Sequence, residues 1–288
     1  MASSLNRTLQ LTNEEFTAPI EALPPAPVDE ITSNLYAGEV ERALKVLPHN
    51  YFDLVVADPP YNYGVDFGNK SDHRSDQEYF EWVESWISKV HAVMKPQASI
   101  YICCGWEYSG FYQSTLERAG FTVLNRITWK REKGRGAKKN WKQNMEDIWF
   151  AVRDPQQYTF NIDQVKNRKK VIAPYKENGK PKDWAVDDRG EPYRMTHPSN
   201  IWIDLTVPFW SMRENTPHPT QKPEKLMERI LTASSNPGDR VLDLFSGSGT
   251  TSVVAKRLHR EFVGIEMNPE YIRYGLKRLQ LLNQPIKI

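Results

Sequence analysis

The chain alternates short runs of apolar, often β-branched residues with stretches in which apolar residues recur at helical spacing. Short apolar runs bounded by turn signals predict buried strands, here at residues 31–36, 54–57, 99–104, 123–129, 148–152, 240–245 and 262–265. Helical spacing predicts helices at 40–47, 76–94, 108–119, 223–235, 252–258 and 269–282. We expect Asp76 to cap the second helix and Pro96 to end it. The alternation is typical of an α/β sheet.

Three stretches depart from this alternation. Residues 1–30 are polar and then Pro-rich, and we expect a loosely attached, flexible arm. Residues 62–72 hold two glycines and no apolar period, which is typical of a mobile loop beside a site. Residues 154–217 have few apolar residues apart from scattered aromatics, and we expect an inserted recognition lobe. That insertion divides the α/β domain into residues 31–153 and 218–288.

The strand at 54–57 runs into Asp58-Pro59-Pro60-Tyr61, at the end where open α/β sheets bind ligands. Prolines have no N–H group, so this corner offers acceptors only, namely the Asp58 carboxylate and the carbonyls of Asp58 and Pro59. Such a cluster suits a planar group that carries an NH2, because the acceptors can take both amine hydrogens while the Tyr61 ring stacks on the π face. A strand followed by a Pro-Pro turn, with Asp as turn former, is the alternative.

A second corner follows the strand at 240–245, where Ser246-Gly247-Ser248-Gly249-Thr250 turns into a helix and Glu266 ends the next strand. This order is typical of a nucleoside site, in which glycines let the backbone approach the ligand and an acid accepts from the ribose hydroxyls. Carboxylates near a helix N-terminus disfavour a phosphate, and Asp243 lies in the preceding strand. S-adenosylmethionine, which is cationic and lacks phosphate, therefore fits better than NAD. A turn that serves only helix packing is the alternative.

Net charge is only +2, but the charge is unevenly distributed. Residues 126–182 hold 16 Lys or Arg and 6 Asp or Glu, a net charge of +10 against −8 for the rest. A local basic excess indicates a nucleic-acid contact surface, and basic side chains interleaved with glycine at 130–143 suit a loop that closes on phosphates. A solvated charged face is the alternative. The predicted DNA contacts are Lys133, Arg135, Lys138, Lys139, Lys142, Arg168, Lys169 and Lys170.

Cysteine usage and hydropathy argue against other classes of protein. The two cysteines, Cys103 and Cys104, are adjacent and lack the Cys/His spacing of a zinc site. We expect no metal and a reducing, cytoplasmic location. No apolar run approaches the ~18 residues of a membrane span, and the N-terminus has no secretory apolar region.

Together these motifs resemble those of the DNA amino-methyltransferases. Asp58-Pro59-Pro60-Tyr61 is similar to their catalytic motif, and Phe245-Ser246-Gly247-Ser248-Gly249-Thr250 is similar to their cofactor motif. The catalytic motif comes first, a basic region follows, then His218-Pro219-Thr220-Gln221-Lys222-Pro223, and the cofactor motif comes last. This order resembles the β class, which includes adenine-N6 methyltransferases of restriction-modification systems and orphan regulators. The similarity covers most of residues 35–282.

The resemblance implies a Rossmann-like, seven-stranded, mostly parallel sheet with helices on both faces. It implies that Asp58, Pro59, Pro60 and Tyr61 act on a base flipped out of double-stranded DNA, with S-adenosylmethionine as methyl donor. Residues 31–153 are then the catalytic half and 218–288 the cofactor half. Glu266 would hold the ribose, and Thr220 and Lys222 the cofactor's carboxylate. The cofactor residues we predict are Glu39, Thr220, Lys222, Asp243, Phe245, Gly247, Gly249, Thr250 and Glu266. The family often has Gly-Asp where this chain has Gly38-Glu39.

The resemblance favours adenine over cytosine as the target base, since cytosine-N4 enzymes more often have Ser in place of Asp58. A catalytically silent DNA-binding subunit is the alternative from another class, but it should show damage in at least one motif, and both are intact. An RNA or protein-amide substrate is a further alternative, the latter usually with Asn-Pro-Pro-Tyr. A cognate restriction endonuclease, a homodimer and the recognition sequence are left open.

Overall fold

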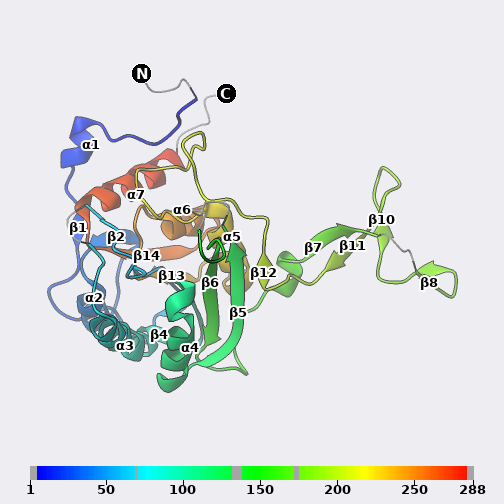
Figure 1. Cartoon of the computed structure of the whole chain (residues 1–288), viewed down its shortest axis with the longest axis horizontal. Helices are drawn as coiled ribbons and strands as arrows, with labels where there is room; N and C mark the ends of the chain where they lie inside the picture. Colours follow the sequence, from blue (N-terminus) through cyan, green and yellow to red (C-terminus); the bar gives the residue numbers. More distant parts are fainter. Residues whose placement is uncertain (1–4, 69–70, 132–137, 172–174, 284–288) are drawn as a thin grey trace.

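The computed structural model describes residues 5–68, 71–131, 138–171 and 175–283. Its central sheet has nine strands in the order β1-β2-β14-β13-β3-β4-β6-β5-β12 (Figure 1). The strands are β1 (Glu21–Ala22), β2 (Asn34–Ala37), β3 (Phe52–Ala57), β4 (Met94–Cys104), β5 (Thr122–Lys130), β6 (Met145–Val152), β12 (Ile201–Trp202), β13 (Arg240–Asp243) and β14 (Glu261–Glu266). The seven predicted strands are all present, and the two-residue strands β1 and β12 extend the sheet at its edges.

Most neighbouring strands run parallel, and only β6 runs antiparallel to its neighbours β4 and β5. Successive side chains of a strand point to opposite faces. Val55 and Ala57 therefore join one hydrophobic cluster, whereas Leu54 and Val56 join the other. Because both faces are covered, the strand is a continuous apolar run instead of an alternating one.

Helices form a layer on each face of the sheet (Figure 1). One face carries α2 (Val40–Val46), α3 (Asp76–Val93) and α4 (Ser109–Arg118). The other carries α5 (Glu224–Ser234), α6 (Thr250–Arg257) and α7 (Pro269–Leu281). Two short 3-10 turns lie at Trp106–Tyr108 and Ile162–Gln164.

Two predicted boundaries of α3 are wrong. Ser75 caps the helix instead of Asp76, because its side chain accepts from the backbone of Glu78, whose own side chain accepts from the Ser75 backbone. The helix ends at Val93, and Pro96 lies inside β4. Proline is tolerated there because pairing with β3 is interrupted between Phe52 and Leu54, so no ladder hydrogen bond is required from it.

The N-terminal arm is not loosely attached, contrary to prediction. It contains α1 (Asn13–Thr17), and β1 pairs with the sheet edge at β2. Lys277 of α7 donates to the Gln10 carbonyl at 2.7 Å and pairs with Glu15 at 2.6 Å. Leu23 is buried at 2 % exposure. A polar, Pro-rich composition did not reveal these anchors, because each depends on a partner more than 200 residues away or on the sheet edge.

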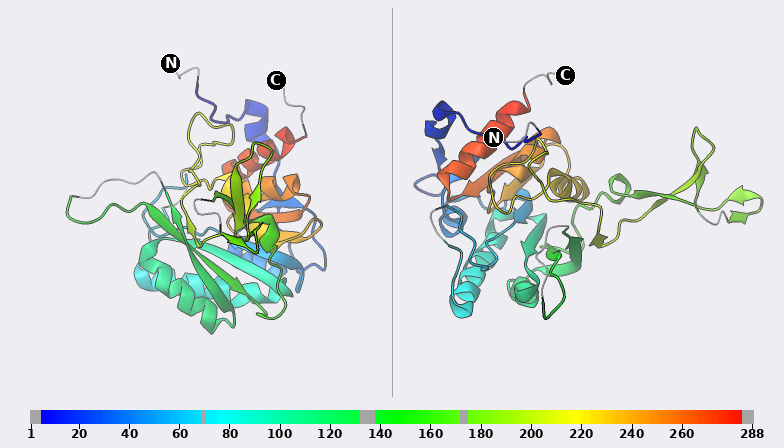
Figure 2. Two further views of the ribbon diagram at one scale, coloured as in Figure 1. Left: turned by 90° about the vertical axis from the view of Figure 1, so that its right-hand side faces the viewer. Right: turned by 45° about the horizontal axis from the view of Figure 1, so that its top comes forward.

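The predicted insertion at 154–217 covers more of the chain than the arm that projects from the sheet. Its middle forms an arm of β7 (Asn167–Lys170), β10 (Ala185–Val186) and β11 (Pro192–Thr196), with β8 (Lys176–Glu177) and β9 (Lys180–Pro181) at the far end. The arm projects well away from the body (Figures 1 and 2). Its last part returns to the sheet, where Trp202 pairs with Trp129, and Leu205 and Val207 are buried in the core.

Candidate active site

The strand order brings the two predicted corners together. β13 lies between β3 and β14, so that Asp243 pairs with Val56 on one side and Gly264 on the other. Asp58, Asp243 and Glu266 therefore stand at the ends of three neighbouring parallel strands, at one edge of the sheet. This is the edge at which open α/β sheets bind ligands.

The Asp58 carboxylate is held by two neighbouring side chains. The Lys222 ammonium donates to both Asp58 oxygens at 2.6 Å. The Tyr61 hydroxyl donates to Asp58 Oδ1 at 2.9 Å and lies 3.1 Å from Glu146 Oε2, so its single hydrogen can turn to either carboxylate. A carboxylate offers about four acceptor positions. Asp58 can therefore accept one further donor, such as an amine.

Glu146, the second residue of β6, is the second carboxylate of this cluster. The Lys222 ammonium lies 3.5 Å from its Oε2, and the Lys222 and Glu146 side chains are each only 5 % exposed. The Arg131 guanidinium, just beyond β5, pairs with the other Glu146 oxygen. The buried cluster thus contains two carboxylates and two cations, and its net charge is zero.

Burial and these charges shift the titration of the cluster. Burial raises the pKa of Asp58 despite the nearby Lys222 cation, and the Glu146 charge raises it further. Burial alone would lower the pKa of Lys222, but the attraction of Asp58 and Glu146 outweighs it and holds that pKa above its usual value. Lys222 is therefore a cation at neutral pH and does not act as a base.

Lys222 and Thr220, which are predicted to hold the cofactor's carboxylate, make contacts within the protein. The Lys222 ammonium lies on Asp58. The Thr220 backbone N–H donates to His218 Nδ1 at 3.3 Å. Contacts of both residues to a cofactor stay predictions.

Sequence reasoning missed Glu146 and Arg131. Glu146 reads as an ordinary strand residue, and Arg131 was counted only within a basic stretch. Because β6 is antiparallel, the beginning of this strand lies at the edge where β4 ends. Only the strand order could have revealed this, since no local motif surrounds either residue.

The glycine corner is shaped by close contacts. Gly247 has φ +49°, and a Cβ added to it would lie 2.8 Å from His218 Nε2. Gly249 has φ +75°, and its added Cβ would lie 3.0 Å from the Cα of Gly275 in α7. Gly249 therefore serves helix packing, the alternative considered for this turn, while Gly247 faces the His218 ring and the site.

Burial shifts the pKa values of two acids at the glycine corner. Burial raises the pKa of Asp243 to about 7, and burial also raises that of Glu266. The two Glu266 oxygens accept from the backbone N–H groups of Gly247 at 2.9 Å and Asn268 at 2.7 Å. Each oxygen retains a lone pair, so Glu266 can still accept from two hydroxyls.

Other predicted cofactor residues have structural contacts. The Thr250 hydroxyl accepts from Arg278 at 2.9 Å, and the same guanidinium donates to the Ser248 carbonyl at 2.9 Å. Arg278 is 5 % exposed and braces the glycine turn, a role that sequence reasoning missed. Phe245 packs edge-on against two tryptophans of α3. Glu39 is exposed, and its neighbour Gly38 donates to the Glu266 carbonyl at 3.0 Å.

The segment after Tyr61 connects the two corners. Asp72 accepts from the Val65 backbone at 2.7 Å and from Tyr63 at 3.2 Å. At the cofactor corner, Asn268 donates to the Phe67 carbonyl at 2.6 Å. The described part of the predicted mobile loop is therefore held by hydrogen bonds.

The predicted DNA contacts are separated in space. Lys138, Lys139 and Lys142 are exposed between β5 and β6, whereas Lys133 and Arg135 lie outside the described residues. Arg168, Lys169 and Lys170 are exposed on β7 of the arm. Within the arm, Arg168 pairs with Asp187, and Lys170 pairs with Glu191 at 2.9 Å. Exposed pairs are worth little, about 0–1 kcal/mol, so a phosphate can replace these partners.

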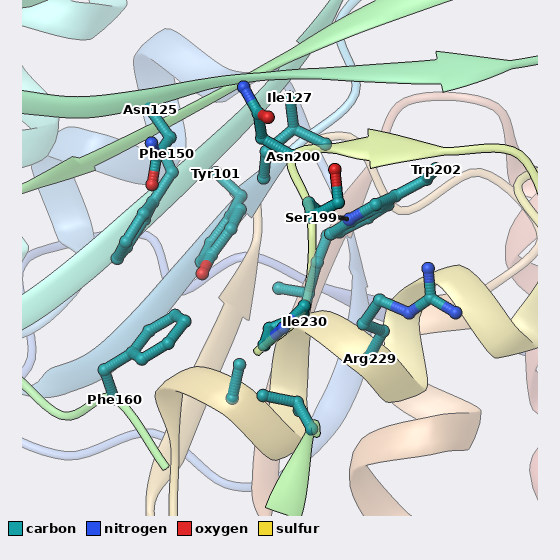
Figure 3. A pocket seen from close by; sticks show the side chains of 13 residues that line it. Tyr101, Asn125, Ile127, Phe150, Phe160, Ser199, Asn200, Trp202, Arg229 and Ile230 are labelled. Carbon is teal, nitrogen blue, oxygen red and sulfur yellow. Dashed lines mark hydrogen bonds between the residues drawn. The ribbon is translucent and has the colours of Figure 1, made fainter. Parts of the chain in front are cut away.

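A separate cavity lies between the sheet and α5 (Figure 3). Tyr101 and Phe150 stack in its wall with ring centroids 4.6 Å apart, and Asn125, Asn200 and Trp202 also line it. None of the predicted site residues lines it. Among the described residues, no group of His, Cys, Asp or Glu is arranged to hold a metal ion, and none of the helices could cross a membrane.

Comparison with known proteins agrees with this geometry. The family described as DNA methylase matches residues 52–277. The type II methyltransferase M.HpaI of Haemophilus parainfluenzae is 36 % identical over 239 residues, 83 % of this chain and 71 % of that protein. The DNA adenine methyltransferase YhdJ of Escherichia coli K12 is 37 % identical over 251 residues, 85 % of this chain and 81 % of that protein.

Solved structures share the architecture. The crystal structure of the M1.HpyAVI–SAM complex has a TM-score of 0.60 and 27 % identity, covering 87 % of this chain and 99 % of that one. The cytosine-N4-specific PvuII DNA methyltransferase has a TM-score of 0.66 at 20 % identity, covering 94 % and 92 %, a likeness of fold alone. The matched family spans both motif corners and the sheet that joins them, and the chain belongs to the DNA methylase family of N6/N4 amino-methyltransferases.

Proposed function

We propose that this protein transfers a methyl group from S-adenosylmethionine to the exocyclic N6 of an adenine flipped out of double-stranded DNA at a specific site. The observation that carries this proposal is the position of the Asp58 carboxylate one strand away from the glycine corner. An amine held at Asp58 and a methyl donor held at Gly247 and Glu266 would then face each other at one sheet edge. The adenine specificity named for YhdJ supports the choice of base.

The residues of the glycine corner fit S-adenosylmethionine. Gly247 presents bare backbone, and Glu266 has acceptor capacity left for the ribose hydroxyls. Asp243 and Glu266 place negative potential beside the N-terminus of α6, which suits a cationic ligand better than a phosphate. When bound, S-adenosylmethionine supplies an electrophilic methyl carbon on its sulfonium.

The chain's own residues prepare the amine. Base flipping costs a few kcal/mol, offset in part by stacking on the Tyr61 ring, worth ~1–3 kcal/mol. Asp58 accepts from the NH2 group and turns the nitrogen towards tetrahedral geometry, so that its lone pair can attack the methyl carbon in line. S-adenosylmethionine held at the glycine corner would supply this methyl group and would keep the electron pair of the carbon–sulfur bond on sulfur. The proton then leaves nitrogen through Asp58 or water. Because positive charge grows on nitrogen, the Asp58 anion favours the transition state over the ground state.

Expression in a methylation-deficient host tests the proposal. Long-read sequencing of the host DNA is expected to show a modified base at one recurring sequence, and mass spectrometry of nucleosides is expected to show N6-methyladenine. N4-methylcytosine would reassign the target base. Unmodified DNA, with the protein folded and present, would support the silent DNA-binding subunit.

The cellular setting follows from a DNA substrate. The proposal places the protein in the cytoplasm with the nucleoid, either as an orphan enzyme or beside a cognate restriction endonuclease. Deleting its gene distinguishes these roles, because loss of methylation is lethal only if an endonuclease cuts the unmodified site. A homodimer stays a prediction, which sedimentation with and without DNA tests.

Adding a methyl group to Gly247 is expected to weaken cofactor binding. In Gly247→Ala the new Cβ crowds His218 and the residue stays at positive φ. Relieving this crowding displaces the turn from the position that fits the cofactor, so we expect the dissociation constant to rise about tenfold or more, measured by calorimetry. Gly249→Ala is the control, because its Cβ meets the backbone of Gly275. It should lower the free energy of unfolding by about 1–3 kcal/mol. Unchanged cofactor affinity in Gly247→Ala would remove this residue from the site.

Cofactor affinity is expected to fall as the pH drops below neutral. Asp243, with a pKa of about 7 in the folded protein, loses its charge as pH falls through that value. A cationic ligand binds the ionised form better, so the affinity should rise between pH 6 and pH 8, measured by calorimetry. Asp243→Asn should flatten that dependence. A profile that Asp243→Asn leaves intact would assign it to another group.

Removing Lys138 and Lys139 is expected to flatten the salt dependence of DNA affinity. Each lysine that neutralises a phosphate contributes about 0.9 to the slope of log K against log salt. The double variant to Gln should therefore lose roughly 1.8 from that slope, measured by fluorescence anisotropy. Lys45 and Lys89, exposed on α2 and α3, provide a charge-matched control pair. Equal slopes in both double variants would support a solvated charged face.

A further inference from the structure

Lys222 lies between two buried carboxylates that belong to different elements. Its ammonium is 2.6 Å from both Asp58 oxygens and 3.5 Å from Glu146 Oε2. Asp58 follows β3, Glu146 is the second residue of β6, and Lys222 precedes α5. The lysine is therefore within a small side-chain movement of a second, equally charged partner.

The contact of the Lys222 ammonium with Asp58 opposes the methyl transfer proposed above. The amine nitrogen becomes positive as it accepts the methyl group, and a cation already in contact with Asp58 weakens the attraction that favours this change. The ammonium also occupies both Asp58 oxygens, so that only one acceptor position of this carboxylate is left for the amine hydrogens. Some group has to draw Lys222 away while the base is bound, without leaving a buried cation unpaired.

We propose that Glu146 is a positioning residue that receives Lys222 when the target amine enters, and so leaves Asp58 free to hold that amine. This inference rests on the proposed function and adds a residue that does not touch the substrate. Lys222 alternates between a resting pair with Asp58 and a working pair with Glu146. The cluster has the same net charge in both arrangements, because the ammonium only changes its partner.

Two further contacts suit Glu146 to this role. Arg131 holds one Glu146 oxygen and leaves Oε2 turned towards Lys222. The Tyr61 hydroxyl already donates to Asp58 Oδ1 at 2.9 Å, so Asp58 keeps this donor when the ammonium moves to Glu146. Both carboxylates keep a hydrogen-bond donor throughout the exchange.

Glu146→Gln tests the exchange, because glutamine keeps the shape and one acceptor but loses the charge. We expect the single-turnover rate at saturating DNA and cofactor to fall by roughly 10- to 100-fold, with both dissociation constants unchanged. The matched control is Asp147→Asn, the next residue of β6, which is buried and paired with Arg126 at 2.8 Å outside the cluster. It should lower the unfolding temperature without lowering that rate.

A double-mutant cycle separates this role from simple structural support. If Glu146 acts through Lys222, adding Glu146→Gln to Lys222→Met should not lower the rate below that of Lys222→Met alone. The rate of the double variant should be higher, because the repulsion between the two carboxylates is relieved. An equal fold loss in both backgrounds, or a wild-type rate in Glu146→Gln, would overturn the proposal.

The ammonium itself gives a readout that does not depend on turnover. In protein labelled with 15N-lysine, the Lys222 signal is identified by its absence from Lys222→Arg. Adding DNA with S-adenosylhomocysteine should shift this signal in the wild type but not in Glu146→Gln. An identical shift in both proteins would contradict the exchange. A wild-type protein that methylates no DNA would instead refute the proposed function, so the two failures are distinguishable.

Discussion

Replacing Asp58 with alanine is expected to reduce methyl transfer by at least about 10³-fold while DNA affinity stays within severalfold of wild type. Loss of one preorganised electrostatic partner typically costs 10²–10³-fold in rate, and Asp58 is both the acceptor for the amine and the anion that faces its developing charge. The fold should tolerate the change, because Lys222 retains Glu146 as a partner at 3.5 Å. Single-turnover transfer of a labelled methyl group to DNA measures the effect.

Asparagine at this position separates the two roles of Asp58. Asp58→Asn keeps one acceptor oxygen but removes the charge, so a rate between those of alanine and wild type would show that both roles contribute. Anisotropy with DNA and calorimetry with the cofactor provide the binding controls. Near wild-type turnover in Asp58→Ala would refute the mechanism, whatever its binding behaviour.

Replacing Lys222 with methionine is expected to destabilise the protein by about 3–5 kcal/mol at pH 8. The change leaves two carboxylates side by side, and the side chains of Asp58 and Glu146 are only 16 % and 5 % exposed. The free energy of unfolding from denaturant titration measures the loss. Adding Glu146→Gln should restore part of this stability, because the repulsion between the two neighbouring carboxylates is then removed.

The destabilisation by Lys222→Met should shrink as the pH falls. Without the ammonium, the Asp58 carboxyl, whose pKa burial already raises, is expected to have a still higher pKa in the folded protein. Its penalty is absent below the pKa of the unfolded chain and grows as pH rises towards the folded value. The difference from wild type should therefore be smaller at pH 5 than at pH 8. A difference that is constant with pH would point to lost packing of the lysine stem.

Local signals in the sequence predicted most of the sheet. The run from Leu54 to Ala57 is apolar because both faces are covered, and α5 lies where Pro223 indicated a first turn. Errors arose where a distant partner overrides local preference. Pro96 lies within a strand because pairing with β3 is irregular there. The N-terminal arm is held by contacts with α7 and β2.

The active site was predictable in one part and hidden in another. Asp58, Tyr61, Gly247 and Glu266 belong to motifs whose residue types already indicate their chemistry. Glu146 and Arg278 belong to no motif, and each contributes through a contact with a residue that is remote in the sequence.

The sequence by itself determined the α/β alternation, the two motif corners and their order, because each depends on residues that are neighbours along the chain. Only the tertiary structure decided that Lys222 pairs with Asp58 and that Glu146 lies beside the same ammonium. The physical reason is that burial makes any unpaired charge costly, so the partners of these ions are chosen by proximity in the folded sheet and not by distance along the sequence.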